Sequence, residues 1–506
     1  MQTYLLFQLL RRTPRPTLQF AAQTVLPVLH RDFVGGLPAE AAHHVLRFMD
    51  TRTLCRAACV SRKWLRAVDG DRTLWRARLL DARNGAALAA AASTPHAAAA
   101  AGNAFKAQYA RDYRLDRNWQ AGACRHFSFA CDGGAVVTCV QLTDRYIVAG
   151  FDTKNIFVFD IDTGATVRQL VGHEGGVWAL AVVGGTVVSG STDRTVRVWD
   201  LESGRCTHVF AGHSSTVRCL QVLLPTDVRT ARERALGAPV RYEPPEPLVV
   251  TGSRDTTLRV WKLPSPLNDA PYSPRSASIA MPSIGDAAMR FRSPFGVPRA
   301  NPYFVRTLGG HTDSVRAVAG HGNMVVSGSY DFSIRVWNLA TGAQLHQLEG
   351  HTSKVYTIVL DTERHLILSG SMDGTIRVWN WDSGACLRIL RGHLTLVGLL
   401  ALQHDTLVSA GADTTLRIWD HPTVARPQPN VLRQHTSAIT CFQHDGTKIV
   451  SGADTTLKLW DVRTGAFVRD LLANLTSVWQ VRFDKRRCVA AVNRNDVTYF
   501  EVMDFE

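Results

Sequence analysis

A histidine, a serine and an aspartate recur together along the chain, and these residue types at one site would suggest nucleophilic catalysis by a Ser–His–Asp triad. The first such set is His173, Ser189 and Asp193, followed by Trp199. Equivalent sets are His213/Thr251/Asp255/Trp261, His311/Ser327/Asp331/Trp337, His351/Ser369/Asp373/Trp379 and His393/Ser409/Asp413/Trp419. A catalytic triad is a single constellation, whereas these sets recur along the chain. We therefore interpret them as structural and assign no catalytic residue.

The recurring histidines define an internal repeat. Gly-His at His173, His213, His311, His351 and His393 continues as Gln-His at His435, and the histidines lie 40 to 42 residues apart (213−173, 393−351) wherever nothing is inserted. Short β-branched runs with Gly or Asp at the turns separate each histidine from its tryptophan, which predicts strands. The pattern resembles the WD-repeat family. That resemblance implies a β-propeller in which His, Ser, Asp and Trp form a buried hydrogen-bond network in each blade.

Two flanking segments complete the count of repeats. Residues 136–160 and 474–505 have the same strand rhythm but end in Phe-Asp and Phe-Glu. We therefore predict an all-β, eight-bladed propeller over residues 123–506, with residues 125–130 as the outer strand of the last blade. Irregular spacing locates insertions at about 224–247 and 265–301. Both are rich in Pro, Ser, Arg and Ala, so we expect mobile surface loops.

Comparison of equivalent repeat positions reveals a basic and aromatic sector. The residues five after the repeat histidine are Trp178, Arg218, Arg316, Tyr356, Gly398 and Thr440. The residues before the turn aspartate are Thr192, Arg254, Tyr330, Met372, Ala412 and Ala453. Equivalent positions of a radial array converge, so we expect these side chains to meet on one face, together with Arg194 and Thr216. A solvated charged rim is the alternative interpretation.

The segments HSSTVRC, SGSRDTTLRVW, HTDSVRAV and SGSYDFSIRVW are similar to the phosphodegron-reading, archipelago type of F-box/WD-repeat protein. The resemblance implies that Arg218, Arg254 and Arg316 hold a degron phosphate and that aromatic residues wall an apolar pocket. Guanidinium forks match the charge and acceptor oxygens of phosphate. This chain departs from the pattern at Gln480, where the family commonly has arginine, and at Gly398. Both departures reduce the expected selectivity for doubly phosphorylated degrons.

The segment 32–80 predicts short amphipathic helices, with Pro38 at a helix start. Its Leu-Pro start, CVSRKW segment and Leu-Trp ending resemble the F-box. The resemblance implies binding to a Skp-type adaptor and, through it, to a cullin and a RING protein. The candidate adaptor contacts, each weighed against a place in the core, are Leu37, Pro38, Leu46 and Leu54.

The N-terminal part is thus divided into an F-box over 31–80, and an Ala-rich spacer with a linker helix over 81–122. Residues 1–30 form an extension for which two interpretations remain open. One is a transit peptide, and the other is an amphipathic helix that packs on the F-box or on a second copy of the chain, as a homodimer would require.

Composition narrows the functional class. The chain has 57 Lys+Arg and 43 Asp+Glu, a net charge of +14, of which residues 1–120 hold +10 (18−8). The remaining +4 predicts no nucleic-acid surface on the propeller. The ten cysteines include no CxxC pair, which predicts no metal site and a reducing compartment, the nucleus or the cytoplasm. No run of about 20 apolar residues occurs, so we expect no membrane segment.

The sequence therefore predicts a non-enzymatic substrate receptor of an SCF-type ubiquitin ligase that binds phosphorylated protein substrates and needs no cofactor. The alternatives are a WD-repeat scaffold without ligase function, a receptor for unphosphorylated degrons, and an enzyme on a propeller fold. The enzyme would require an unrepeated catalytic constellation or a metal cluster, and the sequence contains neither pattern.

Overall fold

The computed structural model describes residues 13–20, 23, 36–82, 103–131, 134–229, 233–234, 236–265, 269, 272, 301–419, 429–453 and 455–506. The chain divides into two compact units, Met1–Arg117 and Asn118–Glu506. Within the described ranges, no helix has both the length and the hydropathy needed to cross a membrane. Most of the predicted extension 1–30 lies outside the described residues, but residues 13–20 and 23 are described and 15–20 are helical. Residues 83–102 of the predicted spacer and most of the insertion 265–301 also lie outside the described residues.

The first unit is helical. It contains α3 (Ala39–Arg47), α4 (Thr51–Ala58), α5 (Arg62–Gly70), α6 (Arg72–Ala82) and most of α8 (Ala104–Ala121). Side chains cap two of these helices, because the Asp50 carboxylate accepts a hydrogen bond from the Thr53 amide and the Ser61 hydroxyl accepts one from the Trp64 amide. The core of the unit is formed by buried apolar side chains of α3 to α6, namely Ala42, Leu46, Leu54, Ala57, Trp64, Val68, Leu74 and Trp75.

The second unit consists of eight four-stranded antiparallel sheets, the blades of a propeller. The innermost strands are β2 (Val137–Leu142), β6 (Val177–Val183), β10 (Val217–Leu223), β16 (Val315–His321), β20 (Val355–Asp361), β24 (Val397–Gln403), β28 (Cys441–His444) and β32 (Ser477–Phe483). The second strands are β3 (Tyr146–Phe151), β7 (Thr186–Ser191), β13 (Leu248–Ser253), β17 (Met324–Ser329), β21 (Leu366–Ser371), β25 (Thr406–Gly411), β29 (Lys448–Gly452) and β33 (Arg487–Arg494).

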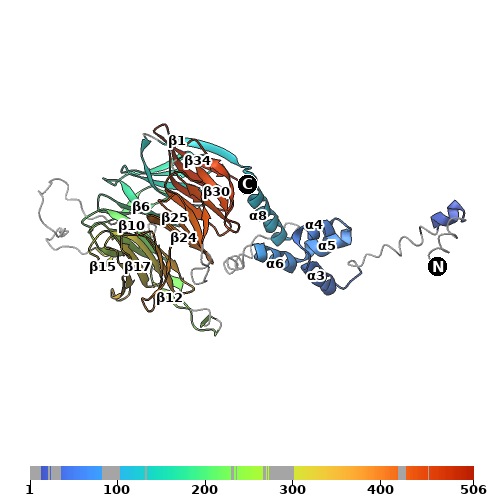
Figure 1. Ribbon diagram of the computed structural model, residues 1–506, viewed down its shortest axis with the longest axis horizontal. Coiled ribbons are helices and arrows are strands. Elements are labelled where there is room, and N and C mark those ends of the chain that lie inside the picture. Colours follow the sequence, from blue (N-terminus) through green and yellow to red (C-terminus); the bar gives the residue numbers. More distant parts are fainter. Residues whose placement is uncertain are drawn as a thin grey trace. The chain divides into compact units, whose positions relative to one another are not determined.

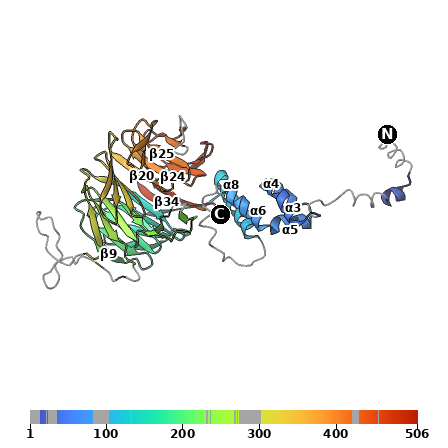
Figure 2. The same ribbon diagram turned by 90° about the horizontal axis from the view of Figure 1, so that it is seen from below.

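The outer half of each blade completes the sheet. The third strands are β4 (Ile156–Asp160), β8 (Val196–Asp200), β14 (Leu258–Lys262), β18 (Ile334–Asn338), β22 (Ile376–Asn380), β26 (Leu416–Trp419), β30 (Leu457–Asp461) and β34 (Val497–Asp504). The outermost strands are β5 (Thr166–Leu170), β9 (Cys206–Phe210), β15 (Phe304–Leu308), β19 (Gln344–Leu348), β23 (Cys386–Leu390), β27 (Asn430–Leu432), β31 (Phe467–Leu472) and β1 (Arg125–Cys131). Innermost strands of successive blades, such as β20 and β24, lie side by side (Figure 2). The prediction of eight blades is confirmed.

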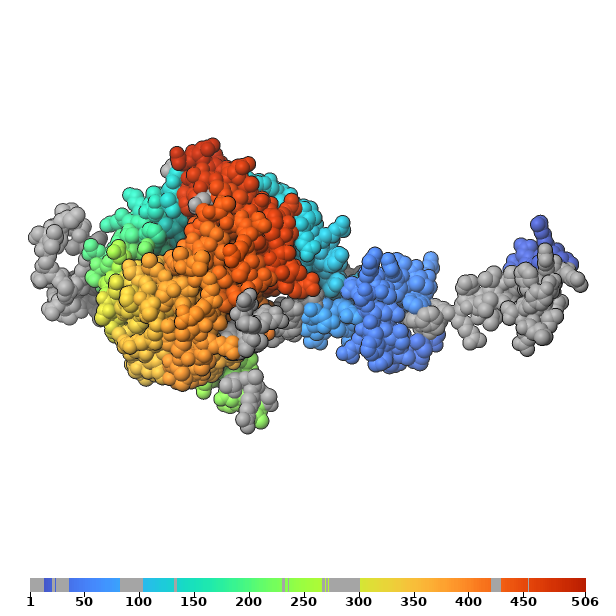
Figure 3. Space-filling view, in the orientation of Figure 1, coloured from blue at the N-terminus to red at the C-terminus, as the bar shows by residue number. Residues whose placement is uncertain are grey.

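The last blade closes the ring with a strand from the start of the second unit. β1 pairs with β34 from Arg125↔Asp504 to Cys131↔Thr498, as the sequence predicted (Figure 1). In the space-filling view the red C-terminal residues lie against the cyan start of this unit (Figure 3). Trp119 stacks on Phe505 with their ring centroids 3.8 Å apart, and its indole donates a hydrogen bond to the Lys485 carbonyl. The first and the last segments of this unit therefore pack against each other.

The insertion in the third blade has more structure than a simple loop. Its ends form a short ribbon, because β11 (Thr226–Asp227) pairs with β12 (Tyr242–Glu243). Asp227 also forms an ion pair with Arg229 at 2.7 Å. In the second insertion, the described Tyr272 forms a parallel β-bridge to His208 of β9.

Candidate functional site

The repeated His, Ser, Asp and Trp form the same hydrogen-bond network in five blades. In the second blade, His173 Nδ1 lies 2.7 Å from Asp193 Oδ2 and His173 Nε2 lies 2.8 Å from Ser189 Oγ. The Trp199 indole donates to the same Ser189 Oγ at 2.8 Å. Histidine and serine are both buried, so the network satisfies polar groups that water cannot reach.

Electrostatics determine the protonation of this network. Burial lowers the pKa of His173, so the imidazole is neutral at pH 7 and donates from Nδ1 to Asp193 while Nε2 accepts from the Ser189 hydroxyl. Burial alone would raise the pKa of Asp193, but hydrogen bonds from His173 and Thr195 hold it well below the usual range. A serine hydroxyl that is enclosed and fully engaged in this way stabilises a blade. The structural interpretation of the sets is therefore supported in each blade that has one.

A β-bulge places the first set of candidate site residues. In seven blades the pairing of the innermost strand with its neighbour skips one residue near the strand start, for example between Val217 and Cys219. The skipped residues are Thr138, Trp178, Arg218, Arg316, Tyr356, Gly398 and Trp479. A bulge leaves the extra residue out of the ladder and re-aims its side chain. The position five residues after the repeat histidine is therefore a bulge that directs a side chain to the propeller face.

A repeated backbone hydrogen bond places the second set beside the first. The amide of Arg254 donates to the Thr216 carbonyl at 3.0 Å, and the amide of Tyr330 donates to the Ser314 carbonyl at 3.0 Å. The same bond links Thr192 to Gly176 and Met372 to Lys354 in their blades. In these four blades, each acceptor lies two residues before the bulge residue. The residue before the turn aspartate is therefore a neighbour of the bulge residue of its own blade.

Contacts between blades assemble five of the candidate residues into one cluster. The Arg218 guanidinium lies over the Trp178 ring, with Cζ 4.4 Å from the centroid, and the Arg316 guanidinium lies 6.0 Å from the Tyr356 centroid. The Tyr330 and Tyr356 rings are 5.2 Å apart. Cation–π contacts of this kind attract a guanidinium to the face of the ring, and Arg218 also forms a side-chain hydrogen bond with Tyr330. We call Trp178, Arg218, Arg316, Tyr330 and Tyr356 the arginine–aromatic cluster.

The cluster carries positive charge that nothing nearby neutralises. Burial lowers the pKa of Arg218, and the charges of Arg316 and Arg254 lower it further. Arginine nevertheless stays protonated at neutral pH. Within the described part of the chain, no carboxylate forms an ion pair with Arg218, Arg254 or Arg316. Converging guanidinium groups without a counter-ion are the chemistry of an oxyanion site.

The remaining candidates lie beside the bulge residues, and the charge of Arg254 acts on Arg218. Arg194, Thr192 and Arg254 are exposed on the turns between second and third strands, and Thr216 is half-buried. Arg194 has a left-handed backbone with φ of 70°.

One neighbour of the cluster and one further bulge residue escaped the sequence comparison. Lys354 Nζ lies 4.7 Å from the Tyr330 centroid. Trp479 is the bulge residue of the last blade and packs against the core between the last and first blades. The offset of five from Asn474, which stands at the position of the repeat histidine, was the signal for Trp479.

Gln480 is used to join blades. Its side-chain amide donates to the Thr138 carbonyl of the first blade at 3.0 Å. The position at which the family resemblance leads one to expect arginine therefore contributes to closure of the ring.

The helical unit corrects two of the expected adaptor contacts. Leu46 and Leu54 are both 0% exposed, because they pack against Trp64, Val68 and Trp75 in the core of this unit, so they present no surface to a partner. Leu37 and Pro38 are exposed, as expected. The exposed apolar side chains that the sequence analysis missed are Val45, Phe48, Val60 and Leu65. Helical spacing could not separate them from core positions, because apolar residues cover more than one side of these helices.

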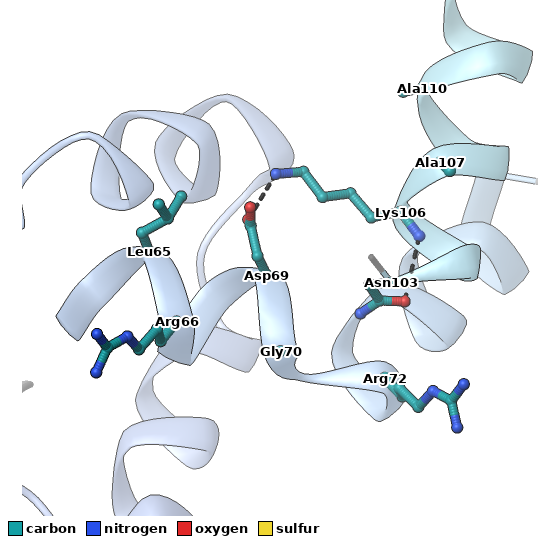
Figure 4. A pocket seen from close by; sticks show the side chains of 9 residues that line it. All are labelled: Leu65, Arg66, Asp69, Gly70, Arg72, Asn103, Lys106, Ala107 and Ala110. Atoms are coloured by element: carbon teal, nitrogen blue, oxygen red, sulfur yellow. Dashed lines mark hydrogen bonds and ion pairs between the residues drawn. The ribbon is translucent and has the colours of Figure 1, made fainter. Parts of the chain in front are cut away.

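A hollow of about 730 Å³ lies in the same unit, between the end of α5 and the start of α8 (Figure 4). Lys106 forms an ion pair with Asp69 at 2.5 Å across it. Asn103 caps α8, because its side-chain oxygen accepts from the amides of Phe105 and Lys106, and its amide donates to the Asp71 carbonyl. These bonds tie the linker helix to the F-box segment within the first unit.

Comparison with known proteins places the chain in a family. Residues 34–81 match the F-box-like family, and residues 164–200, 240–262, 302–338, 342–380, 384–420 and 427–461 match the WD domain, G-beta repeat. The cell division control protein 4 of Candida albicans is 39% identical over all of this chain and 72% of its own length. The chain belongs to the F-box/WD-repeat family.

Three further proteins are similar to this chain over different shares of its length. The WD repeat-containing protein pop1 of Schizosaccharomyces pombe is 37% identical over 99% of this chain, which spans 64% of that protein. The probable E3 ubiquitin ligase complex SCF subunit sconB of Arthroderma otae is 29% identical over 31% of this chain and 26% of its own. A computationally designed protein, Ika8, matches 73% of this chain and 98% of its own, with a TM-score of 0.56 and 28% identity.

Proposed function

We propose that this protein is the substrate-recognition subunit of an SCF-type ubiquitin ligase, which binds phosphorylated degrons on the arginine–aromatic cluster and a Skp-type adaptor through the F-box. Its relative sconB is described as a probable SCF subunit, and the family membership supports the same role here. The receptor itself performs no chemistry. It holds a substrate close to the ligase machinery and so raises the effective concentration of the acceptor lysine.

The observation that carries the proposal is the convergence of Arg218, Arg254 and Arg316 beside aromatic rings without a carboxylate partner in the described residues. A phosphate group brings up to two negative charges and several acceptor oxygens to such a site. Tyr330 and Tyr356, with their ring centroids 5.2 Å apart, offer an apolar wall for the residues that flank the phosphate. Loss of one arginine from a buried, hydrogen-bonded pair with phosphate costs about 2–5 kcal/mol.

The adaptor proposal rests on the exposed apolar residues of the helical unit. Phe48 is 78% exposed and Val60 is 64% exposed, and Leu37 and Pro38 are also accessible. We infer that these exposed apolar side chains belong to one surface for a protein partner, since a large exposed apolar patch is typical of such a surface. Through the adaptor the chain would reach a cullin and a RING protein.

The first experiment measures phosphopeptide binding by fluorescence anisotropy, with the full chain co-purified with a Skp-type adaptor. The probe is an apolar–pThr–Pro peptide, compared with its unphosphorylated counterpart. We expect binding that requires the phosphate and is lost in Arg218→Ala. Arg168→Ala serves as the control, because Arg168 is an exposed arginine of β5 outside the cluster. Equal binding of both peptides would instead favour a receptor for unphosphorylated degrons.

A second experiment tests the ligase side. Phe48→Asp should abolish co-purification with the adaptor, because it places a charge in the proposed apolar contact. Tyr113→Asp is the matched control, since Tyr113 is an exposed aromatic residue of α8 in the same unit. A wild-type chain that binds no Skp-type adaptor would favour the alternative of a WD-repeat scaffold without ligase function.

A further inference from the structure

A ring of equivalent residues lines the central channel, three positions beyond the bulge residues. Each ring residue belongs to the innermost strand of its blade and pairs with the third residue of the second strand. Arg482, for example, pairs with Val489, and Gln443 pairs with Val450. All eight ring residues are half-buried. Around Arg482, the preceding Val481 and the following Phe483 are buried in the core. This alternation of burial along the strand directs the ring side chains toward the channel.

Arg482 is the single charged residue of this ring. The ring holds glutamine in three blades, at Gln141, Gln221 and Gln443, and alanine or valine in the other four. The glutamines are already engaged, since Gln141 donates to the Leu180 carbonyl and Gln443 to the Phe483 carbonyl. A cation therefore stands in an otherwise neutral ring.

The surroundings of Arg482 supply no counter-ion. Its Nη1 donates to the Val481 carbonyl at 3.1 Å, and no carboxylate in the described ranges pairs with it. The ionisable groups that act on it are the thiols of Cys139 and Cys441, and burial raises the pKa of these thiols to about 11 and about 12, so both are neutral. Burial also lowers the pKa of Arg482 itself. A guanidinium has five N–H donors, so most of its hydrogen-bonding capacity remains available.

We propose that Arg482 forms an oxyanion site in the central channel, and that its ligand is a phosphate group. Arg482 has no carboxylate partner in the described residues and keeps free N–H donors, so an oxyanion from the channel can bind to it through charge-assisted hydrogen bonds. Arg218 and Arg316 occupy bulge positions, three residues nearer the start of their innermost strands than the ring. Their positive charges add to the potential that draws an anion to the channel mouth. The side-chain amide of Gln480 donates to the Thr138 carbonyl of the next blade. Arg482 is therefore the residue of the last blade that we expect to bind the anion.

The phosphate has two sources, which the test separates. It is either inorganic phosphate from solution or a second phosphoryl group on a peptide bound at the arginine–aromatic cluster. The first source is independent of the proposed function, whereas the second rests on it. Arg482→Gln is the natural test variant, because glutamine already occupies this ring position in three blades.

The first arm uses inorganic phosphate and the full chain in complex with the adaptor. Binding is followed by ³¹P NMR at constant ionic strength in an Arg218→Ala background, which weakens the cluster's own affinity for anions. We expect Arg482→Gln to weaken phosphate binding by about thirtyfold relative to that background, because phosphate loses a charged hydrogen-bond partner. Arg482→Lys should restore part of it. An unchanged thermal midpoint would show that these variants fold.

The second arm compares peptides with one and two phosphates on the chain that retains Arg218. If Arg482→Gln weakens the doubly phosphorylated peptide and leaves the singly phosphorylated one unchanged, the channel anion is carried by the substrate. If it affects inorganic phosphate alone, the anion comes from solution. If it changes neither, the channel site does not exist. The effect of Arg218→Ala on phosphopeptide binding tests the proposed function of the arginine–aromatic cluster. It does not test the channel site at Arg482.

Discussion

The guanidinium of Arg218 lies over the indole ring of Trp178 with Cζ 4.4 Å from the ring centroid, although the two residues belong to different blades. Each is the bulge residue of its innermost strand, 40 residues apart (218−178). The stacking orders a side chain that would otherwise be mobile, and the order is present before any ligand binds. Pre-organisation of this kind reduces the conformational entropy that binding has to overcome.

This relationship predicts that charge alone is insufficient at position 218. Arg218→Lys keeps the positive charge but loses the planar fork and its stacking on Trp178, so phosphopeptide affinity should fall by roughly tenfold. Anisotropy with the phosphorylated and bare peptides measures the effect. Arg168→Lys, at an exposed position of β5, is the matched control and should bind as the wild type does. Full affinity in Arg218→Lys would mean that the phosphate site needs no guanidinium geometry.

The hydrogen-bond network predicts a large effect from a small deletion. Ser327→Ala removes the oxygen that accepts from the Trp337 indole at 2.9 Å and lies 2.8 Å from His311 Nε2. Both partners would remain buried without a hydrogen bond, which should lower the free energy of unfolding by about 2–3 kcal/mol. Urea denaturation measures it. Ser383→Ala, on an exposed turn, is the control and should change stability by less than about 0.5 kcal/mol.

The close approach of two blades at Gly176 predicts a second stability effect. A Cβ at this position would overlap the Asp152 carbonyl of the preceding blade, and a backbone atom cannot move aside as a flexible side chain can. Gly176→Ala should therefore destabilise the propeller by about 1–3 kcal/mol. Gly185 is the comparison, because a Cβ there meets open space, and Gly185→Ala should be neutral or slightly stabilising. Equal stability of the two variants would contradict the close contact.

Buried histidines predict a decline in stability on mild acidification. Burial lowers the pKa of His435 to about 4, and it also lowers the pKa values of His173, His213 and His393. In the unfolded chain a histidine has a pKa of about 6.5. Between these values the unfolded state binds more protons, so the free energy of unfolding falls as pH falls, by up to about 1.4 kcal/mol per pH unit for each histidine.

Denaturation at about pH 7.5, 6.5 and 5.5 tests this dependence. The network carboxylates should not contribute in this window, because their unfolded pKa is near 3.9 and their folded pKa is lower still. Their stabilisation is complete above about pH 5 and is lost only at stronger acidity. His435→Gln should make the slope between pH 6.5 and 5.5 shallower. A stability that does not change across this range would rule out the neutral, buried imidazoles.

The sequence by itself determined the repeat architecture. The spacing from His173 to Trp199 and its recurrence predicted the blades, and the excess strand at 125–130 predicted the closure that β1 and β34 make. The same alignment named the residues of the arginine–aromatic cluster. This was possible because each blade is built from local strand and turn signals, and because a closed radial array brings equal repeat positions together whatever the side chains are.

Only the tertiary structure decided which side of an element a residue faces. Leu46 and Phe48 both lie in apolar helical sequence, yet Leu46 is fully buried and Phe48 is exposed, because packing against neighbouring helices selects one face. The bulge that turns Arg218 outward depends on pairing with β13, and the isolation of Arg482 depends on the absence of a carboxylate on adjoining blades in the described residues. Side-chain direction and charge environment arise from neighbours distant in sequence, so local spacing does not contain them.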